Sequence, residues 1–231
     1  MADATDSAVA RGAPPPRHGS QHAYEVLRGA IVAGRLQPNE RLVEADLILM
    51  VNASRSAVRT ALVRLQQEGL VEHERNRGAK VRFVDEQEAA EILESRMVLE
   101  GLAARHVAKN VTKEQVQELR TILKAMRSLL DAGDLLGASD LNAKFHGRLL
   151  EIAGNKTIQR LVATLSSQLV RFQYRTILLP GRAEQSHTEH LAIVGAVAKG
   201  DPDAAEQAVR DHLTHVVEAL RDRRLTTTSA V

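Results

Sequence analysis

Apolar residues recur at helical spacing through most of the chain after residue 85. Thr112 and Pro202 stand where helices commonly begin, and Gly133, Gly154 and Gly200 stand where they commonly end. Between these signals the spacing of three and four residues predicts six helices, at 86–108, 112–132, 135–153, 156–178, 182–199 and 202–224. We expect these six helices to pack as an antiparallel bundle.

Shorter elements are predicted in the first part of the chain. Apolar positions there predict helices at 22–33, 43–51 and 53–69, and strands at 70–73 and 79–84. Asn52 tolerates the left-handed conformation that a sharp turn between the second and third helices needs. The predicted order is therefore helix, tight turn, helix and a two-stranded hairpin, which makes the whole protein mainly α.

The predicted helix at 53–69 has one apolar face and one polar face. Ser54 is a suitable N-cap, while Arg55 and Arg59 are four residues apart and project together, with Ser56 and Thr60 beside them. Arginine can donate two hydrogen bonds to a guanine edge, and serine or threonine can reach phosphates. The polar face therefore suits DNA recognition, although an isolated pair of arginines is more often a solvated surface.

Basic residues also mark the predicted hairpin. Lys80 and Arg82 alternate with apolar residues after Gly78, which follows Asn76 and Arg77 at the predicted turn. A basic hairpin beside the arginine-bearing helix adds a second surface for duplex DNA.

Together these motifs resemble the winged helix-turn-helix of the GntR superfamily of bacterial transcription regulators. The resemblance covers AGRLQPNERLVEADL (33–47), SRSAVRTAL (54–62), LQQEGLV (65–71) and RGAKV (77–81). It implies that Arg55 and Arg59 contact bases and that Gly78 is the wing tip. Two departures are Asn52 in place of the usual glycine, and an apolar patch whose role the resemblance does not assign, formed by Ile48, Leu49 and Met50.

The second part of the chain resembles the FCD effector domain of the FadR subfamily. The motifs are ESRMVLEGLAARHVA (94–108), FHGRLLEIAGN (145–155) and EHLAIVGAVAKGD (189–201), and six helices instead of seven resemble the VanR-like branch. We expect a disordered tail at 1–21, rich in Pro, Gly, Ala and Ser. The DNA-binding domain should span 22–84, the helical domain 85–225 and a C-terminal tail 226–231.

The amino-acid composition indicates the cellular compartment and the kind of nucleic acid that the protein binds. The 231 residues include no cysteine, no long apolar run and no apolar N-terminal segment, so we expect a cytoplasmic protein with no membrane partner. Aromatic residues make up only 2%, which disfavours stacking on single strands or RNA. Duplex DNA is the expected nucleic-acid partner.

Several histidines lie on apolar helix faces and are candidate metal ligands. Asn142 and His146 are one turn apart, and His190 and His212 face the apolar side of two later helices. A lone histidine on such a face is more often a hydrogen-bonded core residue. The FCD resemblance implies that these four residues bind a divalent metal, with zinc or nickel expected. Asparagine in place of the commoner aspartate should make this binding weak.

Arg96 interrupts an apolar helical stripe, where a charge needs an anionic partner. Glu100, four residues later, is one candidate, and an anionic ligand is the other. The FCD resemblance favours the ligand and implies an effector pocket at Arg96. Arg171 and Arg175 are weaker candidates for the same pocket.

The sequence thus indicates a homodimeric, ligand-responsive repressor that binds an inverted-repeat operator and is controlled by a small carboxylic acid near a metal. One rival is a metal-dependent enzyme built on the bundle, with the winged domain as a DNA-targeting appendage. No acidic residue is evident in sequence as a general base beside the metal ligands, which disfavours the enzyme. Another rival is an architectural DNA-binding protein without a pocket.

Overall fold

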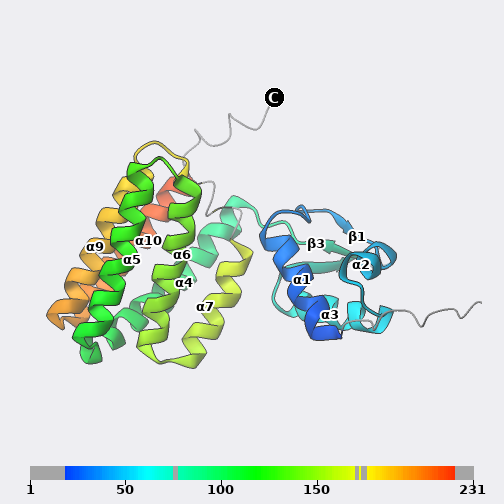
Figure 1. The fold of residues 1–231 in the computed structure, drawn as a ribbon, viewed down its shortest axis with the longest axis horizontal. Helices are drawn as coiled ribbons and strands as arrows, with labels where there is room; N and C mark the ends of the chain where they lie inside the picture. Colours follow the sequence, from blue (N-terminus) through cyan, green and yellow to red (C-terminus); the bar gives the residue numbers. More distant parts are fainter. Residues whose placement is uncertain (1–18, 75–77, 170–171, 173–175, 222–231) are drawn as a thin grey trace, which may run out of the picture. The chain divides into compact units, whose positions relative to one another are not determined.

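The computed structural model describes residues 19–74, 78–169, 172 and 176–221, and it divides into two compact units, residues 1–81 and 82–231 (Figure 1). Helices dominate both units, and the first also contains a small antiparallel sheet, so the mainly α fold is confirmed. Among the residues described, no helix combines the length and the hydropathy needed to cross a membrane.

Three helices form most of the first unit: α1 (Ser20–Val32), α2 (Glu44–Val51) and α3 (Arg55–Gln67). Asn52 takes the predicted left-handed conformation between α2 and α3, with φ 45° and ψ 49°. The Ser54 side chain accepts a hydrogen bond from the Ala57 amide, as expected of an N-cap. Helix α1 begins two residues earlier than predicted, inside the expected tail, and the rest of that tail, residues 1–18, lies outside the described residues.

The sheet contains one strand that the sequence pattern did not predict. Its strands are β1 (Arg41–Leu42), β2 (Val71–Glu74) and β3 (Gly78–Val81), in the order β1-β3-β2. A strand of two residues is too short to show alternation, which explains why β1 was missed. The strand expected to reach Val84 ends at Val81, and Phe83, an apolar residue of the predicted strand, lies beyond this end and is 45% exposed.

The first unit has its own hydrophobic core, made by α1, α2, α3 and the sheet. Leu27 of α1 and Leu65 of α3 are among its most completely buried side chains. The apolar patch on α2 divides: Ile48 packs against this core, whereas Leu49 and Met50 are 81% and 48% exposed. The core thus accounts for one of the three patch residues.

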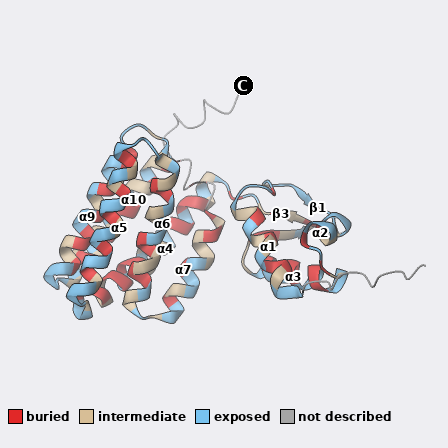
Figure 2. Ribbon diagram, viewed as in Figure 1, coloured by how far each residue is buried: buried red, intermediate tan, exposed pale blue. Residues whose placement is uncertain are grey.

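The second unit is a helical bundle that includes α4 (Glu86–Asn110), α5 (Lys113–Asp131), α6 (Leu135–Ala153), α7 (Lys156–Gln168), α9 (Arg182–Lys199) and α10 (Pro202–Leu220). Helix α4 packs against α6, α7, α9 and α10, while α5 packs against α6 and α9. Figure 2 shows buried residues in red within both units and exposed residues on the outer helix faces.

Helix α7 is shorter than the predicted helix at 156–178. It ends at Gln168, where the Leu169 amide bonds the Ser166 carbonyl in a tightened last turn. Beyond it, Leu169 and Phe172 are again buried apolar residues. Because apolar residues recur at helical spacing on both sides of the break, the sequence pattern could not reveal it. The expected C-terminal tail, residues 226–231, lies outside the described residues.

Candidate functional site

Three histidines from three helices meet in the interior of the second unit. His146 lies on α6, His190 on α9 and His212 on α10, and one ring nitrogen of each lies within 4.8 Å of the others. All three side chains are buried. The fold therefore brings together the three histidines selected from the sequence, in a cluster that could hold a metal ion.

Two carboxylates, Glu100 fully buried and Glu189 partly buried, fix the orientation of two of these rings. Nδ1 of His146 lies 3.1 Å from Glu100, and Nδ1 of His212 lies 2.6 Å from Glu189. An ionised carboxylate only accepts hydrogen bonds, so each Nδ1 carries the proton and each Nε2 keeps its lone pair. Burial alone would raise the pKa of Glu100, but Arg96 and His146 outweigh it and hold that pKa at about 2. Both rings thus offer Nε2 as a metal ligand.

Three further polar atoms at the cluster have no hydrogen-bond partner among the described residues. Both ring nitrogens of His190 are buried without a hydrogen bond, and so is Oδ1 of Asn142, one turn before His146. Burial lowers the pKa of His190 well below its ordinary value and that of His212 to about 4, so both rings are neutral near pH 7. Neutral imidazoles and an amide oxygen are suitable ligands for a borderline divalent metal.

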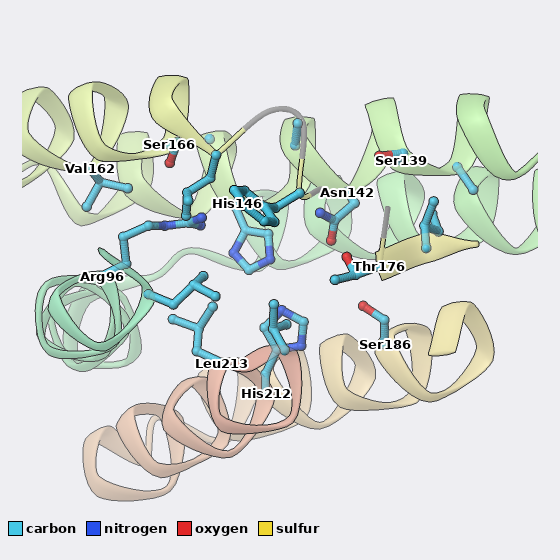
Figure 3. Close-up of a pocket in the computed structure, with 18 of the residues that line it drawn as sticks. Arg96, Ser139, Asn142, His146, Val162, Ser166, Thr176, Ser186, His212 and Leu213 are labelled. Carbon is cyan, nitrogen blue, oxygen red and sulfur yellow. The ribbon is translucent and has the colours of Figure 1, made fainter. Parts of the chain in front are cut away.

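A cavity of about 390 Å³ opens beside the cluster, and Arg96, Asn142, His146 and His212 all line it (Figure 3). Arg96 extends from α4 toward His146, and its Nε donates to Glu100 at 2.7 Å. The two alternatives considered for Arg96 are therefore compatible, because the residue pairs with Glu100 and also lines the cavity. Arg171 and Arg175 lie outside the described residues.

Sequence reasoning missed three charged residues at this site. The prediction that no acidic residue lies beside the metal ligands was wrong, because Glu100 and Glu189 both contact the cluster. Arg182, which lines the same cavity, was also missed. Glu100 was considered only as a partner for Arg96, and the adjacency of Glu189 to His190 gave no hint that Glu189 binds His212 of another helix. Both carboxylates are already bound to histidines and arginines, so neither is a free base.

The residues predicted to contact bases lie on one exposed face of α3. Side chains of Arg55 and Arg59 are 69% and 62% exposed, and both approach Glu44 of α2, at 3.9 and 2.7 Å. Hydroxyl groups of Ser54 and Ser56 lie 3.0 Å apart. The Thr60 hydroxyl, one turn on, donates to the Ser56 carbonyl. This face therefore presents two exposed cations that share one partly exposed carboxylate.

The predicted wing residues have different surroundings. Gly78 begins β3 at φ +83°, a conformation that favours glycine. Lys80 binds Glu72 and Glu74 of the neighbouring strand, at 3.1 and 2.7 Å. Arg82 lies beyond β3 in the second unit, where it donates to Gln168 at 2.9 Å and pairs with Glu88. Of the two predicted wing cations, only Lys80 belongs to the sheet.

Both units match known families. The family described as "Bacterial regulatory proteins, gntR family" matches residues 20–81, and the family described as "FCD domain" matches residues 91–215. The chain is 28% identical over 210 residues to the HTH-type transcriptional repressor RspR of Escherichia coli (strain K12), covering 91% of this chain and 92% of RspR. It is also 28% identical over 196 residues to the Nta operon transcriptional regulator of Aminobacter aminovorans, covering 82% and 90%. These relatives are transcription regulators, which are not enzymes, so the enzyme alternative finds no support.

Solved structures share the architecture. Escherichia coli McbR/YncC superposes with a TM-score of 0.74 at 18% identity, covering 89% of this chain and 98% of the other. The structure of Lar, which controls expression of the agr system in Listeria monocytogenes, gives a TM-score of 0.60 at 22% identity, covering 90% and 98%. At these identities the likeness concerns the fold alone.

Proposed function

We propose that this protein, which belongs to the bacterial GntR family of transcription regulators and carries an FCD domain, is a repressor controlled by a small organic acid bound beside a metal ion. One observation carries the proposal: Arg96 lines the same cavity as His146 and His212, two members of the buried three-histidine cluster. Neutral nitrogen ligands and a guanidinium at one cavity form a site for an anion that also coordinates metal.

In this proposal α3 reads the operator. Arg55 and Arg59 donate to base edges, and Ser54, Ser56 and Thr60 contact the phosphates near the start of the helix. Gly78 and Lys80 contribute through the wing, as does Arg82 if it leaves Glu88 and Gln168. A homodimer with two-fold symmetry would select an inverted repeat.

The metal site of this proposal uses His146, His190, His212 and Asn142. Zinc or nickel suits three imidazoles and one amide oxygen. Because asparagine brings no negative charge, we expect weaker binding than an aspartate in its place would give. Bound there, the metal supplies a Lewis-acidic centre for a carboxylate oxygen, while Arg96 donates hydrogen bonds to the same ligand. Glu100 and Glu189 hold two of the imidazoles in the tautomer that coordinates.

Regulation then follows from differential affinity. A ligand that binds the DNA-incompetent arrangement more tightly than the competent one shifts the population away from the operator. The ligand needs no contact with DNA, because its binding energy is expressed in the equilibrium between the two arrangements.

The test combines metal, acid and DNA. A duplex selected from a random pool serves as the operator probe, and zinc-loaded full-length protein is titrated with it in the presence of a panel of small organic acids. We expect at least one acid to release the duplex from the wild type, and the triple alanine variant of His146, His190 and His212 to lose both zinc binding and this response. The single variant His106→Ala, on α4 outside the cluster, should retain both. Failure to enrich any duplex, or an unchanged response in the triple variant, contradicts the proposal.

A further inference from the structure

A second arginine lines the cavity, and unlike Arg96 it is buried, with one nitrogen of its guanidinium unpaired among the described residues. Arg182 begins α9 and is only 6% exposed. Its Nη2 donates to Glu189 at 3.1 Å, but its Nη1 is buried and has no acceptor in the described part of the chain. An unsatisfied buried donor on a charged group is costly, so a cavity ligand that accepts from Nη1 would be favoured.

The cavity places Arg96 and the start of α9 on different sides of the histidine cluster. Ser186 lies one turn after Arg182 on the same face of α9, and both residues line the cavity. In Figure 3, Arg96 and Ser186 lie on opposite sides of His146 and His212. A ligand that reaches from Arg96 across the cluster toward Ser186 therefore meets a donor group at each end.

The charges of the described side chains that line the cavity indicate how many negative charges a ligand should carry. Arg96 is balanced by Glu100 and Arg182 by Glu189, and the lining carboxylate of Glu151 pairs with Arg148 at 2.9 Å. Asn142 and the coordinating imidazoles add no charge. A divalent metal therefore brings two positive charges that these side chains do not neutralise. A monocarboxylate would leave one of those charges uncompensated in a buried site, whereas a dianion would compensate both.

We infer that the effector is a dicarboxylate held at both ends. One carboxylate coordinates the metal and accepts from Arg96, and the second accepts from Nη1 of Arg182 and the hydroxyl of Ser186. This inference rests on the proposed function and specifies the chemical class of its effector. A phosphate ester fits less well, because it concentrates both charges at one end and leaves Arg182 or the metal without an anion.

Matched pairs of acids test the second carboxylate directly. Isothermal titration of zinc-loaded, full-length protein compares linear dicarboxylates of three to six carbons, and their 2-hydroxy forms, with monocarboxylates of the same length. We expect the best dicarboxylate to bind about tenfold more tightly than its monocarboxylate partner, the gain of one charge-assisted contact. Arg182→Gln should bring the affinity for the dicarboxylate down to that for its monocarboxylate partner, and Ser186→Ala should reduce the preference less.

Two controls separate a ligand contact from damage to the fold. Arg182→Lys retains the charge that pairs with Glu189 and should keep part of the preference. Arg210→Gln removes an arginine that pairs with Glu206 on α10, outside the cavity, and should change nothing. A monocarboxylate that binds as tightly as every dicarboxylate and releases DNA would overturn this inference and leave the proposed function intact. If no acid binds at all, the control by organic acids fails, and this inference fails with it.

Discussion

Arginine is used in opposite ways in the two units. On α3, Arg55 and Arg59 are mostly exposed and share one partly exposed partner, Glu44. In the bundle, Arg96 is partly buried and Arg182 is buried, and each has a glutamate of its own that also binds a histidine of the cluster. The first pair is loosely held at the surface, whereas the second pair is built into the interior.

This difference determines what each arginine can do. Exposed ion pairs contribute little to stability, so the α3 arginines can exchange Glu44 for DNA at small cost. A buried pair is different, because removing one partner leaves an uncompensated charge inside the protein. We therefore expect substitutions in the bundle to affect folding and substitutions on α3 to affect DNA binding.

The largest effect is expected at Glu100. Glu100→Ala leaves both Arg96 and Nδ1 of His146 without their buried acceptor, and we expect a loss of roughly 3–5 kcal/mol in the free energy of unfolding of the helical unit. Urea denaturation of metal-free protein, followed by circular dichroism, measures this loss. Glu118→Ala removes an exposed partner of Arg148 from the same unit and should cost far less. Equal losses in the two variants would show that the buried pair has no special structural role.

A smaller and different effect is expected on α3. Arg59→Ala and Arg55→Ala should each weaken binding to a selected operator by about tenfold to a hundredfold, through loss of a bidentate base contact, without moving the unfolding midpoint. Fluorescence anisotropy with the operator and with single-base variants measures affinity and preference together. The matched control is Arg35→Ala, which removes an exposed arginine between α1 and β1 and should leave operator binding unchanged. If either variant binds every duplex as the wild type does, that arginine does not read bases.

The smallest effect is expected at Lys80. Because Glu72 and Glu74 already hold its ammonium, Lys80→Gln should weaken binding to all duplexes by only about twofold to threefold and lower the salt slope by about one or less. Titrations at several salt concentrations, on operator and random duplex alike, measure both quantities. A loss confined to the operator would instead assign Lys80 a role in sequence recognition.

The sequence predicted the features that depend on neighbouring residues. The Ser54 cap, the Asn52 turn and the inward faces of the histidine-bearing helices all follow from spacing within one element. The pairing of Glu189 with His212 joins α9 to α10, and a sequence pattern within either helix cannot reveal it. Arg182 was missed for a similar reason, since its burial depends on how the start of α9 packs in the bundle.

Because each unit has its own hydrophobic core, the two units can fold one after the other during translation. Every residue of the core cluster in the first unit lies between Ala23 and Val81, so all of its partners leave the ribosome early. Helix α4 instead packs against α10, which begins about 90 residues after α4 ends. Because domains fold as units during translation, we expect the first unit to be folded on the nascent chain before the helical unit is complete. Until α10 has been made, the nascent chain lacks the helix that carries His212, so its three-histidine cluster is incomplete.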